Sequence, residues 1–159
     1  MTRVGRNRRP RRDGRPPGDA TAIHPATLLA PFVFLVHDIE ETLQVERMNA
    51  IAQATRRRLP APLTKWVGRL HYTRRTMGAI AAGLFALQVG FTVWSRRSRR
   101  GERALSMALR IRRSNGLTHI GQTIMRRQYV PGVATAPAVM ATAGLALRAL
   151  KRGRIARLG

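Results

Sequence analysis

The chain contains no cysteine among its 159 residues, which excludes disulfide bonds and thiolate metal sites. It is also poor in acidic residues, with seven Asp and Glu against thirty Lys and Arg and a formal net charge of +23. A chain this basic is expected to attract anions, either nucleic acid or the anionic face of a bilayer. The length allows one compact domain or a small helical bundle, not two domains.

Three apolar runs decide between these partners. Residues 76–95 carry no charge, residues 130–147 are also uncharged, and residues 20–36 are apolar and reach spanning length if the helix continues through Ile39. A helix needs ~20 apolar residues to cross a bilayer, and a soluble domain has no need for a helix that is apolar on all sides. The sequence therefore predicts an all-α membrane helical bundle.

A fourth segment, residues 104–125, is long enough to span but carries Arg110, Arg112 and Arg113 in its middle. Each Arg at the centre of a span costs ~2.5–3.5 kcal/mol, so this helix is not expected to insert alone. Inserted against a partner that carries carboxylates, it completes four transmembrane helices. The alternative is a helix lying in the interface with its Arg side chains among the headgroups.

The basic residues flank the apolar runs, as charges at a membrane edge do, and they form no single stripe. We expect residues 1–19 to be a disordered Arg-rich tail, residues 20–150 the membrane domain and residues 151–159 a basic tail. No zinc finger, basic zipper or RNA-recognition pattern is present, which argues against nucleic acid. The predicted partners are the lipid bilayer and its anionic headgroups. Both termini are expected in the cytoplasm, for an integral protein of the plasma membrane.

Four of the seven carboxylates gather at the end of the first apolar run, in His37-Asp38-Ile39-Glu40-Glu41 and at Glu46. Positions three and four apart share a helix face, so His37, Glu40 and Glu41 should project together while Asp38 points toward solvent or a neighbouring helix. One imidazole and two carboxylates suit Mn, Fe or Zn, and they equally suit proton transfer. Negative charge is disfavoured at a helix C-terminus, so a cation or a proton should compensate it.

Two later elements add to this motif. Asn115 and His119 lie one turn apart within residues 104–125, and residues 126–132 form a basic, aromatic turn with Pro-Gly before the last apolar run. With His-x-x-Glu-Glu before them, the chain resembles the HXXEE domain family over roughly residues 26–150. The resemblance implies a small multi-pass membrane protein of undefined activity.

With four spans, the end of the first, the start of the second and the end of the third lie on one side of the membrane. The candidate catalytic or metal-ligating residues are then His37, Glu40, Glu41 and His119. Asn115 and Tyr129 would support them from outside the site. If the third helix lies in the interface instead, His119 falls on the opposite side from the motif.

Several functions remain open. The polar site binds a divalent metal or transfers protons at one membrane boundary, in hydrolytic chemistry on a membrane-borne substrate. Alternatively the protein is a non-catalytic scaffold or a transporter-like component, with its acids paired to Arg47, Arg74 or Arg75 to set helix register. A third hypothesis is a nucleic-acid or anionic-lipid binder that acts through the Arg-rich segments. The sequence does not decide whether the protein is an enzyme.

Overall fold

The computed structural model describes residues 24–57, 60 and 72–155, and this part of the chain folds as α-helices without strands. The helices are α1 Pro25–Leu43, α2 Val45–Arg56, α4 Arg74–Ser95, α5 Arg99–Arg126 and α6 Ala136–Ile155. The all-α prediction is confirmed. The expected Arg-rich tail, residues 1–19, and the end of the basic C-terminal tail, residues 156–159, lie outside the described residues.

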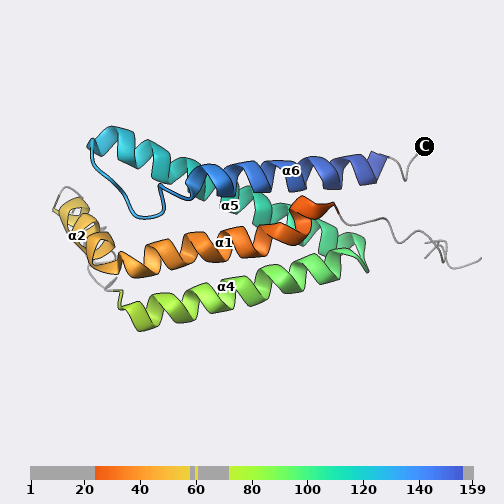
Figure 1. The fold of residues 1–159 in the computed structure, drawn as a ribbon, viewed down its shortest axis with the longest axis horizontal. Helices are drawn as coiled ribbons and strands as arrows, with labels where there is room; N and C mark the ends of the chain where they lie inside the picture. The colour runs from red at the N-terminus through yellow and green to blue at the C-terminus, as the bar shows by residue number, and fades with distance from the viewer. Residues whose placement is uncertain (1–23, 58–59, 61–71, 156–159) are drawn as a thin grey trace, which may run out of the picture.

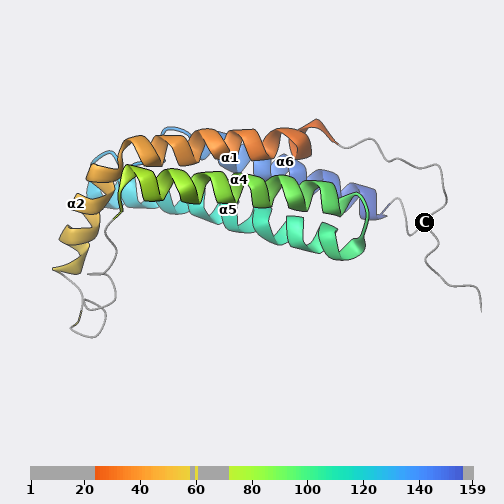
Figure 2. The same ribbon diagram turned by 90° about the horizontal axis from the view of Figure 1, so that it is seen from below.

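The four long helices lie side by side as an elongated bundle, with α2 turning away at one end (Figures 1 and 2). Helix α1 packs against α4 and α6, and α5 packs against the same two helices. Helices α1 and α5 therefore face each other diagonally across the interior. We call the end that holds Leu43, Arg74, Arg126 and Ala136 the motif end.

Local sequence explains where the helices begin. Pro25 opens α1, where its fixed φ and missing N–H suit a first helical turn. The Thr73 hydroxyl accepts a hydrogen bond from the Thr76 amide at the start of α4, and Ser98 caps α5 in the same way. The short connection between α4 and α5 makes these two helices antiparallel neighbours. The last turns of α5 accordingly lie at the same end of the bundle as the HXXEE motif of α1.

The helix bounds agree with the apolar runs except at the last helix. Helix α1 continues past Ile39 to Leu43, so the whole motif lies on it. Helix α5 includes residues 104–125 and packs within the bundle along α4 and α6. The sequence placed the last span at residues 130–147 with a Pro-Gly turn through residue 132, whereas α6 begins only at Ala136. The preceding residues form turns whose amides bind the motif.

The bundle carries apolar side chains outside and several polar ones inside. On α1 the exposed large residues are all apolar: Leu28, Leu29, Phe32, Val36, Ile39 and Leu43. The same helix buries His37 and Asp38, and α4 and α5 bury Gln88, Thr92 and Glu102. An apolar core of small residues around Phe34, Leu105 and Leu109 fills the half of the interior away from the motif end.

Among the described residues, α4 is the one helix that is long and apolar enough to cross a membrane by length and composition. Only 22% of its apolar stretch is buried inside the bundle, so most of that stretch faces outward. Helices α1, α5 and α6 do not meet this test; α5 carries charged side chains along its length, while those of α1 and α6 lie in the C-terminal half of each helix. The expected four transmembrane helices are thus not established by composition alone.

Arg112 explains how one central arginine of α5 is accommodated. Its guanidinium donates two hydrogen bonds, 2.6 and 2.7 Å long, to the two carboxylate oxygens of Asp38, and both side chains are largely buried. The guanidinium also lies over the Phe34 ring, 5.4 Å from its centroid. Asp38 therefore faces the neighbouring helix rather than solvent, and it is the carboxylate partner that α5 requires.

Breaking this pair should destabilise the bundle. In Asp38→Asn the Arg112 guanidinium stays buried without a counter-charge, and we expect the free energy of unfolding to fall by about 3–5 kcal/mol. Replacing both partners, as Asp38→Leu with Arg112→Met, should cost less because no buried charge remains. Thermal unfolding followed by circular dichroism measures the effect. The exposed Arg100→Gln on the same helix is the control, and an equal loss in that variant would contradict the assignment.

Candidate functional site

The three motif residues on one face of α1 reach three different sets of partners. His37 is fully buried and points toward α5 and the turns before α6. Glu41 lies one turn later and points to His119 on α5. Glu40 points to the turns before α6. The site lies near the motif end of the bundle, between α1, α5 and the start of α6.

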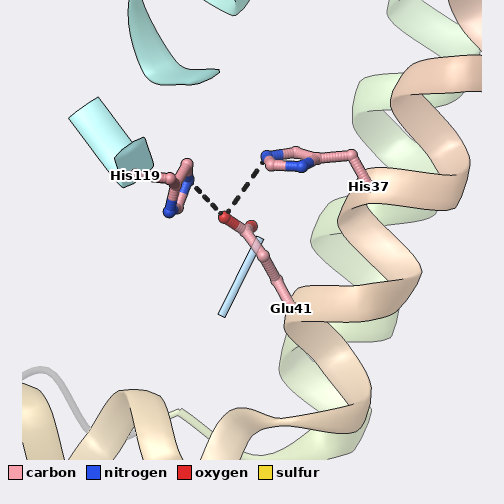
Figure 3. A group of neighbouring side chains, drawn as sticks. All are labelled: His37, Glu41 and His119. Atoms are coloured by element: carbon pink, nitrogen blue, oxygen red, sulfur yellow. Dashed lines mark ion pairs between the residues drawn. The ribbon is translucent and has the colours of Figure 1, made fainter. Parts of the chain in front are cut away.

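His37, Glu41 and His119 form a compact cluster (Figure 3). The Oε1 atom of Glu41 lies 2.9 Å from Nε2 of His119 and 3.5 Å from Nε2 of His37. The two imidazole rings meet edge to face, with centroids 5.1 Å apart. Each residue presents one ligand atom, and the three atoms lie within 4.8 Å of one another. We refer to these three residues as the His/Glu cluster.

The hydrogen bonds around His37 assign its tautomer. The Thr135 hydroxyl donates its hydrogen to Oε2 of Glu40 at 2.6 Å, so its oxygen accepts from Nδ1–H of His37 at 2.7 Å. On the other side of the ring, the Asn115 amide donates to Nε2 at 3.3 Å. Both contacts place the proton on Nδ1 and the lone pair on Nε2. Nε2 therefore carries no proton, as in a metal-ligating histidine held through its other nitrogen, although its one lone pair accepts from Asn115 in this structure.

Residues in the turns before α6 donate the hydrogen bonds that the Glu40 carboxylate accepts. Its carboxylate accepts hydrogen bonds from the Tyr129 hydroxyl, from the Gly132, Ala134 and Thr135 amides at 3.0, 3.3 and 3.0 Å, and from the Thr135 hydroxyl. These donors fasten residues 129–135 onto α1. Glu40 therefore lies beside the His/Glu cluster, linked to His37 through Thr135, and not among its three ligand atoms.

Tyr129 ties this loop to the start of α2. Its hydroxyl donates to Glu40 and accepts a hydrogen bond from Gln44 at 3.0 Å, while the Arg47 guanidinium lies over its ring at 5.1 Å. Burial raises the pKa of Tyr129, and the Glu40 carboxylate that accepts its hydroxyl raises it further. The phenol thus stays protonated and keeps donating to Glu40.

Gly132 leaves the space between the three cluster residues open. Its φ of 88° lies in the left-handed region that favours glycine. A Cβ at this position would lie 2.8 Å from Cε1 of His37, 3.0 Å from Cε1 of His119 and 3.1 Å from Oε1 of Glu41. The backbone of the Pro131-Gly132 turn therefore forms one wall of the site.

The chemistry of the donor set fits a divalent cation. Both ring nitrogens of His119 are buried, and neither has a hydrogen bond to any residue that the structure describes, although Nε2 closely approaches Glu41. Two imidazoles and one carboxylate are ligands that Zn, Fe and Mn accept. Three protein ligands leave a coordination position for a further group, which is typical of catalytic rather than structural zinc sites.

Sequence reasoning did not identify every residue at this site. Gly132 lies in the predicted Pro-Gly turn but was not named as a site residue, and Thr135 lies in a stretch that was expected to belong to the last helix. Arg74, a proposed partner of the motif acids, pairs instead with Glu46 at 3.2 Å on the surface. His71, one of the four histidines, lies outside the described residues.

These features define an all-α bundle with a His/Glu cluster built on a His-x-x-Glu-Glu helix. The chain belongs to the family described as protein of unknown function with HXXEE motif, whose model matches residues 28–147. The resemblance seen in the sequence is therefore confirmed. No curated protein and no solved structure matches this chain.

Adding one methyl group at Gly132 should close the site. In Gly132→Ala the Cβ meets His37 and His119 and the backbone is strained at positive φ, so we expect zinc affinity to fall by about tenfold or more. Gly121→Ala is the matched control, because a Cβ there meets nothing within 4 Å. Equilibrium dialysis with zinc compares the two variants. Unchanged zinc binding in Gly132→Ala would contradict this geometry.

Proposed function

We propose that the protein is a multi-pass membrane protein that holds a divalent metal in its His/Glu cluster, near one boundary of the bilayer. The observation that carries the proposal is the inverted distribution of side chains in the bundle. Large apolar side chains point outward from α1 and α4, while a histidine, a carboxylate–guanidinium pair and an amide are buried inside. Water as the surrounding solvent would favour the reverse arrangement.

The side chains of α1 give the main argument that a second helix, besides α4, crosses the membrane. Its outward face is a continuous apolar strip from Leu28 to Leu43, although its sequence includes three acids. Those acids point inward or toward the loop before α6, where Arg112 and the loop amides satisfy Asp38 and Glu40. The helix therefore presents to lipid only its apolar side, as intramembrane ionisable residues require.

Membrane topology tests the first part of the proposal. We expect reporter fusions after Gln44 and after Gln128 to lie in one compartment, and fusions after Arg97 and at the C-terminus to lie in the other. Both termini would be cytoplasmic, since the two tails and the loop between α4 and α5 would share one side and together carry most of the basic residues. A chain released from membranes by salt alone would exclude this topology and favour the nucleic-acid or peripheral-lipid hypothesis.

In the proposed metal centre, Nε2 of His37, Oε1 of Glu41 and Nε2 of His119 are the ligands. Thr135 holds the His37 ring through Nδ1 so that Nε2 carries no proton, and Glu40 in turn orients Thr135. A metal bound at Nε2 would displace the Asn115 amide from that nitrogen. When bound, a divalent ion supplies a Lewis acid at the bilayer boundary, which suits hydrolytic chemistry on a membrane-borne substrate.

Metal analysis of the detergent-purified protein tests the second part. We expect one zinc, iron or manganese ion per chain, lost in Glu41→Gln and in His119→Ala. Thr135→Val removes the hydroxyl that holds His37 and should weaken metal affinity by about 10–100-fold without removing a ligand. Glu46→Gln is the control, because this exposed acid pairs only with Arg74 among the described contacts. Equal metal content in all variants would exclude the site.

Proton transfer is the second candidate, and one observation favours it. Contacts run from Glu41 through His37 and Thr135 to Glu40, so carboxylates lie at both ends of an imidazole–hydroxyl chain. A metal-free protein whose proton flux in liposomes falls in Glu41→Gln would favour this function. A metal-free protein with no flux at all would favour the scaffold hypothesis.

A further inference from the structure

A basic groove lies between α5 and α6 on the outside of the bundle, away from the His/Glu cluster. Its volume is about 1190 Å³. Helix α5 lines it from Ser106 to Leu117, and α6 lines it from Met140 to Arg154. We call this feature the α5/α6 groove.

The groove gathers positive charge without matching negative charge. Its cationic residues are Arg110, Arg113, Arg148, Lys151 and Arg154. Arg154 pairs with Glu102 at 3.1 Å. The other four are exposed and form no ion pair with a carboxylate in the part of the chain that the structure describes. Arg112, by contrast, points inward to Asp38.

The two ends of the groove differ in polarity. Gly116 packs against Ala136 and Met140, so the part lined by Leu117 and Met140 lies toward the motif end. Lys151 and Arg154 lie at the opposite end, where α6 finishes. Apolar Leu145 and the small Gly144 line the middle. The positive charge therefore increases toward the end at which α6 finishes, although Arg113, one turn before Leu117, adds a cation to the part toward the motif end.

We propose that the α5/α6 groove binds an anionic phospholipid. The phosphate lies between Arg110, Arg113 and Arg148, and an acyl chain follows Leu117, Met140 and Leu145 toward the motif end. The proposal rests on the membrane crossing proposed above and not on the metal centre. Guanidinium groups at membrane depth need a counter-charge, and a lipid phosphate that accepts paired hydrogen bonds supplies it. Basic pockets between membrane helices bind anionic headgroups in this way.

The amphipathic shape selects a lipid over a soluble phosphate ester. A free phosphate would use only the basic end and would leave the apolar part of the groove unfilled. A phospholipid supplies both groups, because its phosphate pairs with the guanidinium groups while its acyl chain covers the apolar side chains. The end of the groove at Lys151 and Arg154 coincides with the end of the bundle at which α1 begins and α6 finishes (Figure 1).

Native mass spectrometry of the full chain in detergent tests this site. We expect dioleoyl phosphatidylglycerol to bind one per chain and about tenfold or more tightly than dioleoyl phosphatidylcholine. The triple variant Arg110→Gln/Arg113→Gln/Arg148→Gln should lose that preference. The matched control Arg100→Gln/Arg103→Gln/Arg152→Gln removes the same charge from exposed positions of the same helices outside the groove lining and should keep it.

A second variant tests lipid binding without removing any charge and without destabilising the fold. A Cβ at Gly144 meets nothing within 4 Å, so Gly144→Trp fills the groove while retaining every arginine. We expect this variant to lose phosphatidylglycerol binding and to keep its thermal stability. Equal loss in the control triple variant, or glycerol 3-phosphate binding as tightly as the lipid, would overturn the proposal.

The outcomes also separate this proposal from the preceding ones. A groove variant that keeps its metal but shows no change in lipid preference refutes the lipid site alone. A His119→Ala protein that loses its metal but keeps the lipid supports both sites as separate. A chain that is monodisperse without detergent refutes the membrane crossing and the lipid site together.

Discussion

The polar contacts between α1 and α5 across the bundle interior determine where the functional side chains lie. These two helices pack on α4 and α6, so their relative register depends on long side chains that meet in the middle. Arg112 reaches Asp38, and His119 reaches Glu41. A slip of α5 by one turn would separate both pairs and leave a buried guanidinium and a buried carboxylate uncompensated, which is strongly unfavourable. The arginine that made insertion of this helix questionable is therefore the residue that places His119 opposite the motif.

The two adjacent glutamates receive different compensation for their charge. Both lie at the C-terminal end of α1, where the helix dipole disfavours negative charge. Glu40 is compensated by amides just before α6, where unpaired N–H groups converge as they do at anion-binding helix N-termini. Glu41 receives no such amides and faces two imidazoles. The need for a cation or proton, which the sequence assigned to the whole motif, therefore falls on Glu41.

Much of this arrangement follows from spacing in the sequence. The i, i+4 interval of His37 and Glu41 places them on one face, and a helical reading of residues 104–125 returns His119 to the same end of the bundle. The loop before α6 was predicted only in part: the Pro-Gly pair indicates a turn through residue 132, whereas residues 133–135 are uncharged and continue smoothly into an apolar run. Their helical tendency is overridden by hydrogen bonds to Glu40, which is distant in the sequence. The partner of Asp38 was hidden for a related reason, since spacing gives the face on which a side chain lies but not what packs against that face.

The three central arginines of α5 have separate roles because they point in different directions around the helix axis. Successive positions differ by about 100° around the axis, so Arg112 and Arg113 cannot face the same surroundings. Arg112 points inward and is neutralised within the protein. Arg110 and Arg113 are three residues apart, share a face and line the α5/α6 groove. In the proposed membrane setting, the chain itself provides the counter-charge of the first arginine, and lipid phosphates would provide that of the other two. The same helix would thereby join a fixed internal centre to a surface whose counter-charge comes from the membrane.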